Sequence, residues 1–121
     1  MNNKLPKNKE STRFFSTKQE NSVALALGGT RTPNSGAATF SAGDIVVRDA
    51  SLLVECKTPM TDKDSFSIKK DWIEKNKMEA FEMRLDNHCI AFNFGPDQPN
   101  YYIIDERTMK FLVEKLAEDS I

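Results

Sequence analysis

Residues 43–57 read GDIVVRDASLLVECK, and this stretch decides the fold. Two apolar runs flank a short polar turn at 49–50, which is typical of a β-hairpin. In a symmetric hairpin, paired positions have numbers with a constant sum. Asp44 is therefore expected opposite Glu55, with Cβ atoms roughly 5 Å apart on one face of the sheet. A four-residue connection, 48–51, would keep this register, whereas a loop of three or five residues would shift it.

Strand periodicity places a lysine beside these two carboxylates. Side chains alternate between the faces of a strand, so Glu55 and Lys57 share one face and Cys56 points to the other. Two adjacent acids repel each other unless a cation lies between them, and oxygen ligands suit Mg²⁺ or Mn²⁺. The pattern predicts a metal centre in which Lys57 orients a water or offsets phosphate charge. A solvent-exposed pair of Glu55 and Lys57 on an edge strand is the alternative.

Size and composition favour one compact domain. The chain has 121 residues, of which 39% are hydrophobic and 29% charged, which fits a single core. No run approaches the ~20 apolar residues of a membrane span, and the N-terminus lacks a secretory signal. We therefore expect no membrane partner and a cytoplasmic location. Cys56 and Cys89 are expected to be buried thiols rather than a disulfide, and His88 alone cannot support a zinc site.

The charge is unevenly distributed along the chain. The net charge is only −1, yet the first eighteen residues sum to +4 because five basic residues face one acid. These residues are Lys4, Lys7, Lys9, Arg13 and Lys18, against Glu10. A nuclease must keep acids at its metal site, so a near-zero total is compatible with DNA binding. Residues 1–12 are predicted to be a disordered basic tail, which contacts DNA or only aids solubility, and 13–121 a single domain.

The remaining periodicities predict an α/β domain. Helices are expected over 16–27, 68–85 and 106–118, and two further strands over 89–94 and 101–104. The predicted fold is a central mixed β-sheet flanked by helices, in the order α-β-β-α-β-β-α. The loop 28–43 is rich in small and hydroxyl side chains, which indicates a phosphate-contacting loop or a surface excursion.

Apolar spacing predicts the packing face of each helix. In the first helix Glu20 shares a face with Val23, Ala24 and Leu27, so it needs a partner unless it reaches solvent. The packing side of the second helix is marked by Trp72, Ile73, Asn76, Ala80, Phe81 and Met83 or Arg84. The third helix carries Met109, Leu112, Val113 and Leu116 on one face, with Asp105 as its N-cap.

With these motifs in place, the chain resembles the PD-(D/E)xK nuclease superfamily, and within it the Holliday junction resolvases of archaeal type and their phage relatives. The likeness runs from about Phe15 to Leu116. Gly43 stands where the family has proline before the metal-binding aspartate. The residues that match the family, in chain order, are Glu20, Arg31, Ser35-Gly36-Ala37, Asp44, Glu55-Cys56-Lys57 and the stretch 67–72.

The resemblance implies a restriction-endonuclease-like fold and a Mg²⁺-dependent DNA endonuclease, with Mn²⁺ as a substitute. It implies a homodimer that cuts paired strands of four-way junctions. It also implies that the cytoplasm is that of a prokaryotic cell or, for a phage protein, of its host. The implied catalytic residues are Glu20, Asp44, Glu55 and Lys57, and the implied metal ligands are Glu20, Asp44, Glu55 and the backbone carbonyl of Cys56. The residues expected to contact DNA are Arg13, Lys18, Arg31 and Ser35.

Two alternatives remain open at this point. A nuclease of the same fold could act on flaps, single strands or another DNA structure. A non-catalytic DNA-binding module could keep the fold without the chemistry, although the intact set of Asp44, Glu55 and Lys57 argues against it.

Overall fold

The structure, a computed structural model, describes residues 9–32 and 44–120. It has an α/β fold around a five-stranded mixed sheet, with strand order β1-β2-β3-β4-β5. β3 and β4 are parallel, and the other neighbouring strands are antiparallel. The strands are β1 (Thr30–Arg31), β2 (Asp44–Val47), β3 (Leu52–Lys57), β4 (Asn87–Phe92) and β5 (Tyr101–Ile103).

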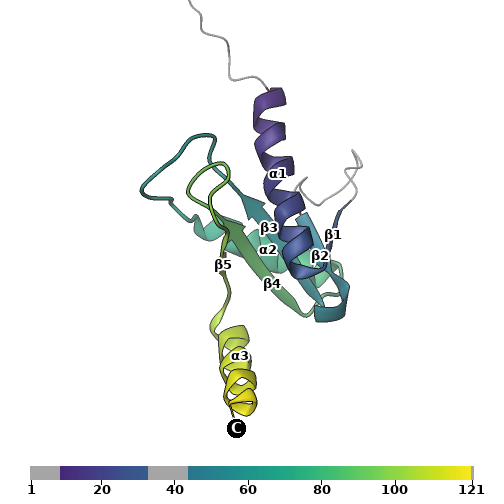
Figure 1. The fold of residues 1–121 in the computed structure, drawn as a ribbon. Helices are drawn as coiled ribbons and strands as arrows, with labels where there is room; N and C mark the ends of the chain where they lie inside the picture. Colours follow the sequence, from purple (N-terminus) through teal and green to yellow (C-terminus); the bar gives the residue numbers. More distant parts are fainter. Residues whose placement is uncertain (1–8, 33–43, 121) are drawn as a thin grey trace, which may run out of the picture.

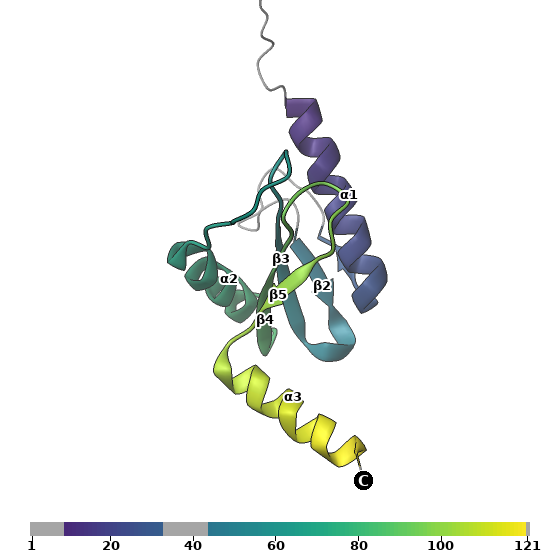
Figure 2. The same cartoon turned by 60° about the vertical axis from the view of Figure 1, so that its left-hand side comes forward.

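The described helices take three different positions around the sheet (Figures 1 and 2). α1 (Lys9–Leu27) covers one face and α2 (Lys70–Glu82) covers the other, whereas α3 (Glu106–Asp119) extends away beyond β5. The predicted class, a mixed sheet flanked by helices, is confirmed in these general terms. The predicted order missed β1, because this two-residue strand lies inside the expected loop 28–43 and gains its regularity only by pairing with β2.

The register of the β2–β3 hairpin is confirmed. Asp44 pairs with Glu55, and Val47 pairs with Leu52. The predicted two-residue turn is wrong, because residues Arg48–Ala50 form a 3₁₀ turn. Ser51 closes this turn in the left-handed conformation, with φ 51°. The connection therefore spans four residues, the length that preserves the pairing of the two carboxylates.

The sheet buries a separate apolar cluster on each face. On the α1 side, the buried residues come mainly from alternating strand positions: Val23, Ile45, Val47, Val54, Cys89 and Ala91. On the α2 side they are Val46, Leu53, Ala80 and Leu85. Successive residues of β2 and β3 alternate between the two clusters, as the two-residue period of a strand requires. Each side chain of these strands therefore faces either α1 or α2. By the same alternation, Asp44, Glu55 and Lys57 lie on the face of the sheet that α2 covers.

The first helix is longer than predicted. It begins at Lys9 rather than Ser16, so residues 9–12 are helical and the prediction of a disordered tail was wrong for them. Residues 1–8 of that predicted tail lie outside the described residues. The helix ends as expected at Gly28, whose φ of +72° suits glycine. A Cβ on Gly29 would lie 2.7 Å from Ile45 Cγ2, so glycine there lets the chain turn close to the sheet.

The packing side of α2 differs from the prediction at one important position. Asn76 and Ala80 are buried as expected, but Phe81 is 80% exposed. Glu79 is buried in its place. Asn76 Nδ2 donates to the carbonyl oxygen of Leu53 at 3.4 Å, which links α2 to the middle of β3. This phase of the helix turns an acid, rather than an aromatic ring, toward the sheet.

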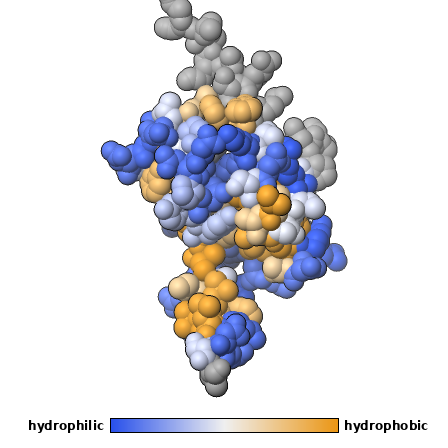
Figure 3. All heavy atoms as spheres, in the orientation of Figure 1, coloured by the Kyte–Doolittle hydropathy of each residue, from blue (hydrophilic) through white to orange (hydrophobic). Residues whose placement is uncertain are grey.

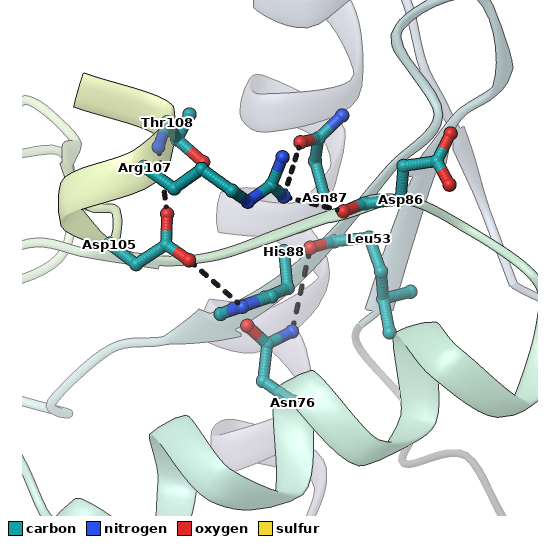
Figure 4. A network of polar contacts seen from close by, with 8 residues as sticks. All are labelled: Leu53, Asn76, Asp86, Asn87, His88, Asp105, Arg107 and Thr108. Atoms are coloured by element: carbon teal, nitrogen blue, oxygen red, sulfur yellow. Dashed lines mark hydrogen bonds and ion pairs between the residues drawn. The ribbon is translucent and has the colours of Figure 1, made fainter. Parts of the chain in front are cut away.

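The root of α3 is held by polar contacts with β4, as Figure 4 shows. Asp105 accepts a hydrogen bond from Thr108 N at 2.9 Å, confirming the predicted N-cap. Its other oxygen lies 3.6 Å from His88 Nε2. Arg107 Nη2 donates to the carbonyl oxygen of Asp86 at 2.8 Å and to Asn87 Oδ1 at 3.1 Å. Burial lowers the pKa of His88, and Asp105 opposes this shift.

Two further predictions can be compared with the structure. Cys56 and Cys89 are free thiols, as expected, but only Cys89 is fully buried and Cys56 is partly exposed. Among the described residues, the helices are too short or too polar to cross a membrane.

Candidate metal centre

Three buried carboxylates meet where β2 begins and β3 approaches its end. Asp44 is fully buried on β2, Glu55 is 3% exposed on β3, and Glu79 of α2 is 4% exposed. Each offers an oxygen atom, and these atoms all lie within 4.8 Å of one another. Asp44 and Glu55 come together through strand pairing, and Glu79 joins them from the helix that covers this face.

Burial and mutual repulsion make this cluster unfavourable for three negative charges. Burial first, and then the proximity of Glu79 and Glu55, raise the pKa of Asp44 to about 8. The pKa of Glu79 is raised mainly by burial and by Glu55, while Lys75 opposes the shift. Closely placed acids in low dielectric favour their neutral forms unless a positive charge compensates them. The cluster therefore has the electrostatic character of a cation site.

Two lysines supply part of that compensation. Lys57 Nζ lies 3.0 Å from Glu55 Oε2, and Lys75 Nζ lies 3.8 Å from Glu79 Oε2. Glu55 Oε1 is buried and has no hydrogen-bond partner among residues 9–32 and 44–120. A buried carboxylate oxygen without a donor is costly, and a bound cation would satisfy it. The donor set of carboxylate oxygens fits Mg²⁺ or Mn²⁺ better than a softer metal.

Lys57 is held at the edge of this centre by its neighbours. Its ammonium group lies over the ring of Trp72, 4.5 Å from the ring centroid. Trp72 in turn packs against Phe66, which stacks on Phe92 of β4. The backbone carbonyl of Lys57 accepts a hydrogen bond from Gln19 Nε2 at 2.9 Å. The Lys57 side chain is 28% exposed, so it contacts both the buried Glu55 and the solvent.

Cys56 contributes no thiolate to the centre. Its side chain packs in the α1 layer, and burial, with Glu20 and Asp44 nearby, raises the pKa of its thiol far above the usual range. The predicted ligand at this position is the backbone carbonyl, which stays a prediction.

The structure does not bring Glu20 into the cluster. Glu20 is buried under α1 and accepts a hydrogen bond from Arg31 Nε at 3.0 Å. Arg31 pairs with Ile45 of β2, whose side chain belongs to the α1 layer. Burial raises the pKa of Glu20, and Arg31 opposes the shift. Glu20 thus has the partner that its inward position required, and this geometry does not support it as a direct ligand of the three-carboxylate site.

The other residues predicted to contact DNA have varied positions. Arg31 is about half exposed, so it could pair with Glu20 and still reach an anion. Lys18 lies on the surface of α1 and forms an ion pair with Asp97. Arg13 belongs to α1, but its side chain lies outside the described residues, as does the whole of Ser35.

Glu79 is the site residue that the sequence reasoning missed. It follows Asn76 by three positions and precedes Ala80 by one, and both of those were placed on the packing side. Assigning the apolar Phe81 to that side masked it. An acid on the inward arc of the helix that follows the Glu-x-Lys strand is the signal that could have identified it.

Comparison of the chain with known proteins finds no matching family model, no matching curated protein and no matching solved structure. Function is therefore inferred from the residues of the site and their geometry.

Proposed function

We propose that this protein is a Mg²⁺-dependent DNA endonuclease of the restriction-endonuclease-like fold, related to the PD-(D/E)xK nucleases that its motifs resemble. Four-way junctions are its first candidate substrate. The observation that carries the proposal is the close grouping of Asp44, Glu55 and Glu79, with Lys57 on Glu55. Carboxylates alone would suit many cation sites, but an adjacent lysine that reaches solvent adds a donor for the attacking water or a phosphate oxygen.

Each residue has a distinct role in this proposal. Asp44, Glu55 and Glu79 would hold Mg²⁺, with the backbone carbonyl of Cys56 as a further ligand. The chemistry that the ion supplies when bound is a lowered pKa of water and neutralisation of phosphate charge. Lys57 would donate a hydrogen bond to the attacking water or to a phosphate oxygen, at a position fixed by Glu55 and Trp72. Glu20 would act indirectly, by holding Arg31 near β2.

DNA would be contacted mainly through its phosphates. Arg31, Lys18 and Arg13 supply positive charge along α1 and β1, and Ser35 lies between β1 and β2 in the sequence. Such contacts are independent of sequence and weaken with salt. Paired cutting of a junction would require two sites, and hence a homodimer. We place this activity in the cytoplasm, where two free thiols remain reduced.

A cleavage assay tests the proposal directly. Labelled four-way junction, flap, single strand and linear duplex are incubated with Mg²⁺, Mn²⁺ or chelator, using the wild type and the Glu55→Gln variant. We expect metal-dependent, paired cuts in the junction and none with Glu55→Gln. Cutting of flaps or single strands alone would change the substrate class. Tight DNA binding without cleavage in any metal would instead identify a non-catalytic module.

A further inference from the structure

Among residues 9–32 and 44–120, the polar contacts that attach α3 to the domain lie at its root. The contacts of Asp105 and Arg107 with β4 fix its first turn (Figure 4), and the helix then projects from the body in both ribbon views. Such a helix normally packs its apolar face on a sheet or on another helix. Here that face stays exposed within the described part of the chain.

The exposed surface of α3 is strongly apolar. Five large apolar side chains, each between 42% and 66% exposed, follow one another along 14 residues. They are Met109, Phe111, Leu112, Val113 and Leu116. Figure 3 shows hydrophobic residues gathered over α3 and at its junction with the body. Single exposed apolar residues are ordinary, but a contiguous group of this kind marks an interaction surface.

A groove lies between α3 and the end of the sheet. It has a volume of about 940 Å³, and its apolar lining includes Leu27, Leu52, Tyr102, Ile104, Phe111 and Leu112. Of the exposed apolar residues of α3, only Phe111 and Leu112 line this groove. Met109, Val113 and Leu116 lie on a neighbouring arc of the helix, so they are available to fill a second, similar groove.

The charges of α3 indicate what would occupy the groove. Its last turn contains Glu118 and Asp119 and no basic residue, although acids are unfavourable at the negative end of a helix dipole. Asp119 has no ion-pair partner among the described residues. Arg107, at the other end of the helix, lines the groove and uses one of its nitrogens for the contacts with β4. Its guanidinium has further donors.

We propose that a second copy of this chain covers the groove, so that two α3 helices pack antiparallel about a two-fold axis and each fills the groove of the other. Val113 and Leu116 of one copy would contact Leu27, Leu52 and Tyr102 of its partner, and Met109 would pack against the last turn of the partner's α3. The acidic last turn of each α3 would then lie beside Arg107 of the other copy. A patch that contains both a ridge and a groove is self-complementary, as a two-fold interface requires.

This inference names the surface for the homodimer of the proposed function, but it does not depend on metal chemistry. A dimer without nuclease activity would refute the proposed function alone. A monomer that cleaves DNA would refute the interface and the paired cutting of junctions, but not the nuclease chemistry.

Sedimentation equilibrium of the full chain, from 1 to 100 μM, tests the interface. We expect a dimer for the wild type and a dissociation constant at least about 100-fold weaker for Leu116→Glu, because each dimer buries the substituted side chain twice. Leu25→Glu is the matched control, since Leu25 is 87% exposed on α1 and lies outside the surface. A monomeric wild type, which would leave the groove to another segment of the same chain, would overturn the proposal. So would a dimer that Leu116→Glu does not weaken.

Asp119→Lys provides a second test, because it should weaken the dimer without destabilising the α3 helix. A cation at the C-terminus of α3 favours the helix dipole, so helicity by circular dichroism should hold or increase. The same change places like charges beside Arg107 of the partner, so the dimer should weaken about 5-fold or more. An unchanged dissociation constant would exclude the antiparallel arrangement. Mn²⁺ binding, measured in parallel, should match the wild type in both variants.

Discussion

The ammonium group of Lys57 is held between Glu55 and the ring of Trp72. Its Nζ lies 3.0 Å from Glu55 Oε2 and 4.5 Å from the ring centroid. The Glu55 carboxylate holds the ammonium group by an ion pair, and the Trp72 ring restricts where the flexible lysine side chain can lie. The lysine is 28% exposed while its carboxylate partner is buried, so the lysine is the member of the pair that solvent reaches.

Lys57→Ala should lower the turnover number by about 100-fold or more, because it removes a donor aimed at the developing charge. Mn²⁺ affinity, measured by isothermal titration calorimetry, should stay within a few-fold of the wild type, since the lysine is not a ligand. Trp72→Ala should lower turnover about 10-fold by releasing the lysine, and Trp72→Phe should restore most of it. A collapse of Mn²⁺ affinity in Lys57→Ala would show that the assigned role is wrong.

Neutralising any one of Asp44, Glu55 or Glu79 as the amide should abolish metal-dependent cleavage. Without metal, the melting temperature of Asp44→Asn should hold or rise, because one source of repulsion in a buried cluster is removed. Glu74→Gln is the control on α2, since Glu74 is exposed and its contact with Lys70 is a surface pair at 3.8 Å. Full activity in Asp44→Asn or Glu55→Gln would refute the site.

Much of this site could be predicted from the sequence, because a strand has only two faces. Once the apolar runs of the hairpin are aligned, the period of two fixes Asp44 opposite Glu55 and places Lys57 on the same side. The prediction survived an incorrect turn, since the two-residue and four-residue connections have the same parity. Short-range regularity was therefore sufficient for three of the four residues at the centre.

A helix has no such restriction, and that is why Glu79 was missed. Residues around a helix differ in direction by about 100° per position, so the sequence leaves a wide choice of which arc faces the sheet. Hydrophobicity alone favours Phe81 over Glu79 as the inward residue. The observed phase depends on the tertiary site, which places an acid beside two others. α3 shows the same limit in a different form. The helix was predicted correctly, but the apolar face marked for packing is exposed. A sequence pattern does not say whether the partner surface of such a face belongs to the same chain.

Comparison of Glu20→Gln with Glu79→Gln should show which of these two acids is the third metal ligand, beside Asp44 and Glu55. Glu20→Gln should leave Mn²⁺ affinity within about 2-fold of the wild type, because the amide can still accept the hydrogen bond from Arg31. Glu79→Gln should weaken Mn²⁺ binding at least about 10-fold, since it removes a charged ligand. Calorimetry on both variants makes the comparison, and the opposite ranking would return Glu20 to the metal centre.

The N-cap of α3 should affect local rather than global stability. Asp105→Ala removes the acceptor for Thr108 N, at a cost of about 1 kcal/mol. Because α3 packs on the body only at its root, we expect faster amide hydrogen exchange over 106–119 and a small change in melting temperature. Asp105→Asn keeps an acceptor and should retain most of the protection. Equal exchange in Asp105→Ala and the wild type would mean that the cap is not needed.

Acid–base linkage at Asp44 should make the metal-free protein less stable as the pH rises. Folding raises the pKa of this group from 3.8 to about 8, so the folded protein keeps a proton that the unfolded chain has released. Unfolding then releases a proton, and stability falls between about pH 4 and pH 8 and levels off above that range. The raised pKa of Glu79 acts in the same direction. The lowered pKa of His88 has the opposite sign, since it costs stability only as the pH falls below about 6.5.

The contribution of Asp44 is isolated by comparing two proteins. Melting temperatures of the wild type and Asp44→Asn are measured from pH 5 to pH 9 in chelator. The His88 contribution is common to both and cancels in the difference. We expect the advantage of Asp44→Asn to grow with pH by on the order of 5 °C or more. Saturating Mg²⁺ should reduce or reverse this trend in the wild type, because the ion binds the ionised carboxylates. A difference that stays constant with pH would mean that Asp44 is already ionised at pH 5, without metal.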